Sequence, residues 1–270
     1  MGEARRERVL DAIVASKRAE IEALKLELAK ESPAAPGARR EGVAERLARP
    51  SGAPLRLLTE IKRKSPSAGA LSTAMGVDDR ARAYARAGAS AISVLCDGPF
   101  FGGSYEDVTR VRAALESEGL STPILAKEFI LDPVQLRRAS AAGADLALLI
   151  VRIVSPEQLG SLVTAARDAG LEPLVEVATE AELRIALATE ARLIGVNARD
   201  LDTLRMDPAR AASLVAAIPE GRVALHLSGL KTPDDVRAVA RGRADGALLG
   251  EILMRQDDPT ALLAELVAAA

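Results

Sequence analysis

The feature that most restricts the fold of this chain is an alternation of short apolar segments with amphipathic segments, repeated eight times after residue 50. The predicted strands are 55–62, 91–95, 123–127, 146–151, 173–177, 192–197, 222–227 and 246–249. Helices are predicted to start near Asp78, Tyr105, Pro133, Pro156, Thr179, Asp207, Thr232 and Pro259. Near-continuous apolar strands, each followed by a helix, are typical of a parallel sheet covered by helices.

Eight such units are the number that closes a (β/α)8 barrel, and the 270 residues of the chain suit a fold that usually needs about 250. An open, doubly wound sheet is the competing architecture, and it normally carries a glycine-rich turn after its first strand. Here the first strand is followed by KSPS, residues 64–67. The sequence therefore predicts an α/β fold with a single (β/α)8 TIM barrel over residues 51–270.

Residues 1–50 are predicted to form a helical extension and a linker in front of the barrel. Within residues 1–30, apolar side chains recur at helical spacing with charges between them. These apolar residues are Val9, Leu10, Ile13, Val14, Ile21, Leu24 and Leu28. The segment SPAAPGARREG, residues 32–42, then breaks the pattern with proline and glycine.

Composition and charge exclude several classes of function. The formal net charge of −2 argues against a nucleic-acid surface, because phosphate backbones are bound by a clustered excess of basic residues. No apolar run approaches about 18 residues and the N-terminus lacks an apolar signal segment, so we expect a cytoplasmic protein that does not enter a membrane. One cysteine, Cys96, and one histidine predict neither an internal disulfide nor a zinc site.

Charged residues interrupt the apolar pattern at the end of the first strand, in the stretch TEIKRKSPS. Because alternate residues of an extended chain share a side, Glu60, Lys62 and Lys64 are predicted to project together, with Ile61 on the other side. Such charges mark either a surface edge or the floor of a site. In a (β/α)8 barrel the carboxyl ends of the strands surround the active site, so the second interpretation is favoured.

Other strand ends carry chemically useful side chains as well. The third strand ends with Lys127, the fifth contains Glu176 in an apolar run, and the sixth ends with Asn197 followed by Arg199. Lysines and carboxylates that converge in a partly desolvated pocket have shifted pKa values and suit general acid–base chemistry on a small molecule. A buried Glu–Lys ion pair without any catalysis is the alternative for Glu176.

The seventh and eighth strands end in Ser228-Gly229 and Gly250. In many barrels these two loops surround a phosphate with backbone N–H groups, although two tight turns would also require glycine. Aromatic residues gather after the second and third strands. They are Phe100, Phe101, Tyr105 and Phe129. They predict either a wall that binds a ring or anchors that hold two loops on the barrel.

These segments together resemble the indole-3-glycerol-phosphate synthase family of tryptophan biosynthesis. The likeness follows the chain in order through EIKRKSPSAG, VLCDGPFFGGSYEDV, ILAKEFILDP, GADLALLIV, LVEV, IGVNARDL, SGLKTPDDV and LLGEILMR. The resemblance implies a lyase without cofactor or metal. Its small phosphorylated substrate, 1-(2-carboxyphenylamino)-1-deoxyribulose 5-phosphate, closes to an indole with loss of CO₂ and water. We expect a monomer or a weak homodimer.

The resemblance also implies roles for the charged residues. Lys127 matches the general acid that assists attack on the carbonyl, and Glu176 matches the acid or base of the dehydration. Lys62 matches a partner of the substrate carboxylate and phosphate that could share the acid role. Glu60 and Asn197 match the groups that orient these side chains and the substrate hydroxyls.

The implied substrate-binding residues form two groups. Ser65, Phe101, Phe129 and Leu148 match positions that hold the anthranilate part. Ser228, Gly229 and Gly250 match the phosphate site, and Arg199 lies near them in sequence.

The chain departs from the family pattern at two positions. Family members usually carry glutamate immediately before the Ser-Gly of the seventh strand, where this chain has Leu227, and His226 before it is expected to point away from the pocket. Family members usually read Lys-Asp-Phe at the third strand, where this chain has Glu128 in the middle, which is expected to face outward.

Two alternatives to an active synthase follow from these residues. Leu227 allows a catalytically impaired or binding-only paralogue. A related phosphate-binding barrel isomerase would need a Cys/Asp or Asp/Asp pair at the first and fifth strands, where this chain has Glu60 and Glu176.

Overall fold

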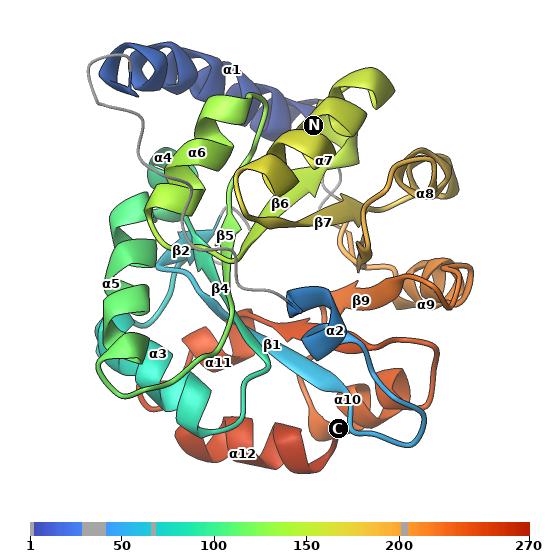
Figure 1. The fold of residues 1–270 in the computed structure, drawn as a ribbon. Coiled ribbons are helices and arrows are strands. Elements are labelled where there is room, and N and C mark those ends of the chain that lie inside the picture. The colour runs from blue at the N-terminus through green and yellow to red at the C-terminus, as the bar shows by residue number, and fades with distance from the viewer. Residues whose placement is uncertain (1–2, 29–41, 66–68, 201–204) are drawn as a thin grey trace.

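Eight parallel strands close into a barrel in the computed structural model, which describes residues 3–28, 42–65, 69–200 and 205–270 (Figure 1). The hydrogen-bonded order around the barrel is β1-β10-β9-β8-β7-β6-β5-β4. Their bounds are β1 Arg56–Ile61, β4 Ala91–Leu95, β5 Ile124–Lys127, β6 Leu146–Ile150, β7 Glu172–Val177, β8 Leu193–Asn197, β9 Val223–Leu227 and β10 Gly246–Leu249. The predicted (β/α)8 barrel is therefore confirmed.

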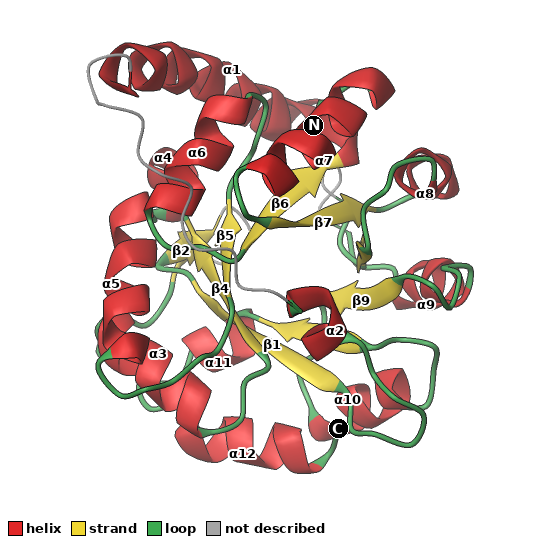
Figure 2. Cartoon of the chain, in the orientation of Figure 1, coloured by secondary structure: helices red, strands yellow, loops and turns green. Residues whose placement is uncertain are grey.

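A helix follows each strand and covers the outside of the barrel (Figure 2). These helices are α3 Val77–Arg86, α5 Tyr105–Glu116, α6 Pro133–Ala141, α7 Pro156–Asp168, α8 Glu180–Leu187, α9 Pro208–Ala216, α10 Pro233–Ala240 and α12 Thr260–Ala268. Most of them start where a side-chain oxygen accepts a backbone N–H of the first turn, as Ser104, Asp132 and Thr179 do. Such caps satisfy N–H groups that have no partner inside the helix, which explains the predicted starts.

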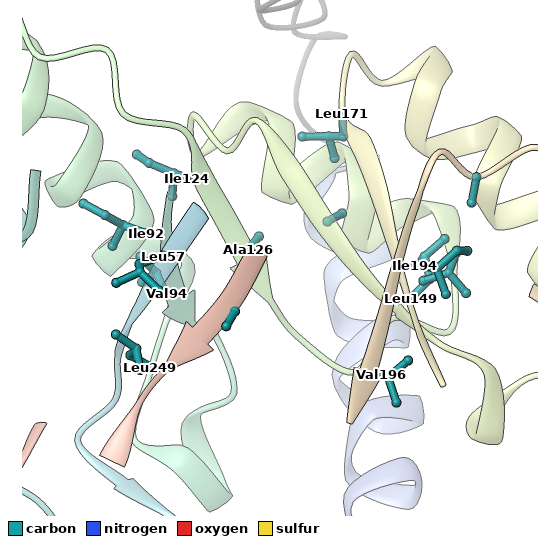
Figure 3. Packing of buried hydrophobic residues seen from close by; sticks show 14 of the residues in the cluster. Leu57, Ile92, Val94, Ile124, Ala126, Leu149, Leu171, Ile194, Val196 and Leu249 are labelled. Carbon is teal, nitrogen blue, oxygen red and sulfur yellow. The ribbon is translucent and has the colours of Figure 1, made fainter. Parts of the chain in front are cut away.

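Alternation along each strand produces two apolar layers. Leu57 and Val94 point outward into a layer between strands and helices, part of which is shown in Figure 3. Leu58, one residue after Leu57, and Leu225 point into the barrel interior. Because the period of a strand is two, this register also directs the side chain of Glu60 inward.

The N-terminal segment contributes to both ends of the barrel interior. The predicted helix of residues 1–30 is confirmed as α1 Glu3–Leu28, which packs alongside α6 (Figure 1). A short helix that the sequence did not predict, α2 Val43–Leu47, buries Val43 and Leu47 among the interior leucines. Most of the predicted linker 32–42 lies outside the described residues, and the division into 1–50 and 51–270 stays a prediction.

Several other short elements were also not predicted. They are the hairpin of β2 Lys64–Ser65 and β3 Gly69–Ala70, the helices α4 Gly98–Phe101 and α11 Glu251–Met254, and the 3-10 turn η1 Val151–Ile153. The first strand ends at Ile61, so Lys64 belongs to the hairpin instead of continuing the strand. Among the described residues, no helix is both long and apolar enough to cross a membrane.

A buried aspartate joins neighbouring strands at the amino-terminal end of the barrel. Asp145 Oδ2 accepts the backbone N–H of Ile124 at 2.7 Å and pairs with Arg112, while the Asp145 N–H donates to Ile124 O at 2.8 Å. Asp245 makes the same pair of hydrogen bonds with Ala224. The similar sequences GADLALL and RADGALL therefore each provide a buried aspartate that links two neighbouring strands.

We predict that Asp145→Ala lowers the free energy of unfolding by about 3 kcal/mol, because it leaves the Arg112 guanidinium without its buried carboxylate. The measurement is urea denaturation followed by circular dichroism. Asp234→Ala is the matched control, since Asp234 is exposed beside Arg237, and we expect a change of less than about 0.5 kcal/mol. Equal losses in the two variants would contradict this account of the strand junction.

Candidate active site

A cavity of about 380 Å³ opens at the carboxyl ends of the barrel strands. All thirteen predicted site residues line it. They are Glu60, Lys62, Ser65, Phe101, Lys127, Phe129, Leu148, Glu176, Asn197, Arg199, Ser228, Gly229 and Gly250. The structure thus brings together residues from all eight barrel strands or the segments that follow them, while their roles stay predictions.

One buried carboxylate organises the charges of the cavity. Glu60 is 2% exposed, and its Oε1 accepts a hydrogen bond from Lys127 Nζ at 2.7 Å while its Oε2 accepts one from Lys62. Burial favours the protonated acid, but the ammonium groups of Lys127 and Lys62 outweigh burial and lower the pKa of Glu60 to about 2. Glu60 is therefore ionised at neutral pH and balances one of the two lysines.

The pKa values of Lys127 and Glu176 are both displaced from their ordinary values. Burial opposes the charged form of Lys127, but Glu60 and Glu176 together raise its pKa above the ordinary value, so the amine is an ammonium at neutral pH. Burial raises the pKa of Glu176, and the opposing effects of Lys127 and of the Asn197 hydrogen bond do not cancel it. Two carboxylates in one cavity thus have pKa values that are displaced in opposite directions, which is typical of acid–base sites.

Asn197 connects the acid–base groups with the loop after β9. Its Nδ2 donates to Glu176 Oε1 at 3.0 Å, and its Oδ1 accepts both the Ser228 hydroxyl at 2.8 Å and the Arg199 backbone N–H at 2.9 Å. Because every polar atom of the amide is used, its orientation is determined by its neighbours. Asn197 therefore fixes the side chain of Glu176.

Backbone geometry shapes the end of the cavity that is formed by the loops after β9 and β10. Among the described residues, Ser228 is the only non-glycine residue with a positive φ, at 69°, and Gly229 follows with a φ of 96°. A Cβ on Gly250 would lie 2.5 Å from Glu60 Oε2, so glycine is required for the carboxylate to fit there. Lys231, which the sequence did not indicate, also lines the cavity and adds positive charge suited to an anion, whereas Arg255 lines it as the partner of Glu251.

An apolar wall forms the remaining side of the cavity. The rings of Phe101 and Phe129 lie with centroids 5.9 Å apart, and Leu148 lines the cavity with them. Leu10 and Ile13 of α1 complete this wall, a contribution that the helical pattern of residues 1–30 did not reveal. Tyr105 lies away from the cavity, with its hydroxyl directed at Gln135 O at 3.4 Å.

Two sequence-based expectations about orientation were wrong. Lys64 is exposed and donates to Pro99 O at 2.8 Å, because the chain leaves the strand at Ile61. Glu128 was expected to face outward but is 3% exposed, lines the cavity and pairs with Lys17 of α1. Alternation no longer applies to Glu128, because β5 ends one residue earlier.

The two other residues singled out on β9 behave as alternation requires. Leu227 points into the barrel interior, where it packs so closely on Gly195 that a Cβ there would lie 2.5 Å from Leu227 Cδ1. His226 is buried between two interior-facing leucines of the strand and therefore points outward, and burial lowers its pKa. Within the described part of the chain, no cluster of His, Cys, Asp and Glu could hold a metal ion.

Comparison with known proteins decides the family. The family model described as indole-3-glycerol phosphate synthase matches residues 10–266. The chain belongs to the indole-3-glycerol phosphate synthase family. An indole-3-glycerol phosphate synthase of Kineococcus radiotolerans is 44% identical over 215 residues, which are 80% of this chain and 77% of that protein. One of Opitutus terrae is 41% identical over 222 residues, 82% of this chain and 83% of that protein.

Solved structures outside the family share the fold. A 3-hexulose-6-phosphate synthase from Salmonella typhimurium has a TM-score of 0.61 at 16% identity and covers 80% of this chain and 98% of its own. A tryptophan synthase alpha chain from Legionella pneumophila subsp. pneumophila also has a TM-score of 0.61 at 16% identity, over 86% of this chain and 96% of its own. At such identities the likeness concerns the barrel alone.

The low pKa of Glu60 leads to a prediction about stability. A carboxyl whose pKa falls from 4.5 to about 2 on folding contributes about 3 kcal/mol of stability at pH 7, and this is lost as the pH falls through that interval. We expect Glu60→Gln to be less stable than the native protein at pH 7, and the difference to shrink by about 2 kcal/mol at pH 3.

Urea denaturation at the two pH values measures this difference. Glu180→Gln is the control, because Glu180 is an exposed glutamate of α8 and its replacement should leave stability unchanged at both pH values. If the free energy of unfolding of Glu60→Gln is below that of the native protein by the same amount at pH 7 and pH 3, the lysines do not hold Glu60 ionised.

Proposed function

We propose that this protein is an indole-3-glycerol-phosphate synthase of tryptophan biosynthesis. It would close 1-(2-carboxyphenylamino)-1-deoxyribulose 5-phosphate to indole-3-glycerol phosphate with release of CO₂ and water. The observation that carries the proposal is the cavity in which Glu60 holds Lys127 as an ammonium beside Glu176, whose pKa is raised. Membership of the family supports the same conclusion.

The first step needs a proton at the ketone oxygen. As the ring carbon that bears the carboxylate attacks C2 of the sugar, negative charge develops on that oxygen. We assign Lys127 as the general acid that donates a proton there, because its ammonium lies in the cavity and is already charged. Lys62, on the other oxygen of Glu60, faces the same space and would share the acid role or bind the substrate carboxylate.

CO₂ and water are then lost without any external electron acceptor. Loss of CO₂ from the attacked ring carbon restores the aromatic ring, and elimination of water across the C1–C2 bond completes the indole. The elimination removes a proton from C1 and protonates the leaving hydroxyl. Glu176 is suited to such an exchange, because its raised pKa brings its two protonation states closer in free energy at neutral pH.

The shape of the cavity suits this substrate. The aromatic ring would lie against Phe101, Phe129 and Leu148, and Ser65 lines the cavity close to them in the loop after β1. The phosphate would lie at the opposite end, with Ser228, Gly229, Gly250 and Arg199 around it. Backbone N–H groups and cations at that end supply what a phosphate requires.

We also infer a monomer or weak homodimer that works in the cytoplasm. Every group assigned to the reaction comes from one chain, so the site needs no partner subunit. A phosphorylated sugar does not cross membranes unaided, which agrees with a cytoplasmic enzyme.

A binding-only paralogue is the second candidate, because Leu227 leaves the cavity without a carboxylate that the family normally has there. Against it, Glu60 contacts both lysines even without that carboxylate, and the other charged residues assigned to the chemistry all line the cavity. A site that had lost its function would be expected to lose more than one of them. We therefore favour the active enzyme.

Turnover tests the proposal directly. Purified protein should form indole-3-glycerol phosphate without added metal or nucleotide, and Lys127→Ala should lower kcat about a thousandfold, as expected for loss of a general acid. Lys64→Ala is the control, since Lys64 is exposed and outside the cavity, and should keep full activity. No product from correctly folded native protein would overturn the proposal.

Leu227→Glu separates the two candidates in the same assay. If the site is active as built, this substitution should change kcat/KM by less than about tenfold. A rise of several orders of magnitude from a near-zero rate would instead identify a decayed enzyme that had lost the carboxylate usual in the family at position 227.

A further inference from the structure

A second buried charge cluster lies beside the active-site cavity and is not used by the proposed chemistry. Its centre is Lys17 of α1, which is 1% exposed. The Lys17 ammonium lies 2.7 Å from Glu20 Oε2 on the same helix, 3.0 Å from Asp97 Oδ1 and 3.1 Å from Glu128 Oε1. Asp97 and Glu128 follow β4 and β5, so one ammonium joins α1 to two separate barrel loops.

The same two carboxylates hold the backbone of the aromatic wall. Asp97 Oδ2 accepts the N–H groups of Phe100 at 2.7 Å and Phe101 at 3.0 Å. Glu128 Oε1 accepts the N–H of Phe129 at 2.8 Å. Each carboxylate therefore binds Lys17 and also the amide of a residue whose ring lines the cavity.

We propose that Lys17 is a positioning residue that sets the spacing of Phe101 and Phe129 and thereby shapes the half of the cavity that receives an aromatic ring. The inference rests on the proposed function for the identity of that ring. Lys17 itself does not line the cavity, and it acts through the two loops that it joins. The rings lie 5.9 Å apart, and this spacing depends on two loops that share one ammonium.

The remainder of α1 supports this assignment. Leu10 and Ile13 line the cavity, and Lys17 follows them on the same face of the helix at the spacing i, i+3, i+7. The helix thus presents two apolar residues to the cavity and, one turn further on, the ammonium that holds the loops. A shift of α1 would move both parts of the wall together.

A purely structural role for Lys17 is the competing explanation. Such a role would only add to the overall stability of the fold, and its loss would weaken binding at both ends of the cavity or at neither. Positioning of the rings predicts a selective loss, because the phosphate end is built from the loops after β8, β9 and β10, which Lys17 does not contact.

The test compares two ligands and three variants. Titration calorimetry should give a dissociation constant for indole-3-glycerol phosphate that rises at least tenfold in Lys17→Met, while the constant for inorganic phosphate changes less than twofold. Lys17→Arg, which keeps the charge, should restore most of the affinity. Lys25→Met is the matched control, because Lys25 lies on the same helix and pairs with Asp132. Asp132 caps α6 and accepts no hydrogen bond from the backbone of Phe101 or Phe129.

Steady-state kinetics provide a second readout. In Lys17→Met we expect a KM that rises at least tenfold with a change in kcat of less than threefold, and no effect in Lys25→Met. If Lys17→Met does not fold, the double variant Lys17→Met, Glu128→Gln buries one unpaired carboxylate fewer than Lys17→Met. It should show the same selective loss of affinity for the ligand that carries the ring. An equal loss of affinity for both ligands, or no loss of affinity for either, would overturn the proposal.

Failure of the proposed function would look different. A native protein that binds indole-3-glycerol phosphate but forms none from the open-chain substrate would disprove the synthase activity. The ring-selective effect of Lys17→Met on binding would still be measurable in that protein.

Discussion

The buried carboxylate of Glu60, shared between Lys62 and Lys127, is the interaction on which the rest of this site depends. An unpaired lysine in such a partly buried position would lose its proton more readily, and an unpaired buried glutamate would tend to keep its own. In this arrangement Glu60 and Lys127 keep their charges inside the cavity. The barrel makes this arrangement possible, because alternation on β1 directs Glu60 inward and Gly250 leaves room for its oxygen.

Two charge clusters of opposite composition meet at the carboxyl end of β5. Lys127 belongs to the first, where a carboxylate lies between two ammonium groups, and Glu128 belongs to the second, where the Lys17 ammonium lies among three carboxylates. In the second cluster burial raises the pKa of Glu128 to about 7, although Lys17 opposes the shift. Consecutive residues at the end of β5 thus connect the acid–base chemistry with the aromatic wall and with α1.

The sequence alone predicted the barrel and the charged residues Glu60, Lys127 and Glu176 of the cavity, because both follow from strand patterns. Ser65 and Leu148 were expected only from the resemblance to a known family. Leu58 and Glu60 share a side of β1 in any extended chain, and eight units leave few other ways to pair the strands. Strand alternation does not predict the orientation of Glu128 and Lys64 or the presence of the short helices α2, α4 and α11. They lie beyond strand ends or in segments too short for a periodic signal, and Lys17 is recognisable only when α1 is placed on the barrel.

A direct measurement of the charge on Lys127 is the most decisive test of this account. Carbon-13 labelled lysine allows the side chains to be titrated by NMR, with Lys127→Arg assigning the signal. The account predicts that the pKa of Lys127 lies above the ordinary lysine pKa of 10.5, so that the side chain remains an ammonium up to that pH. A Lys127 signal that titrates near neutral pH would contradict the central role assigned to Glu60.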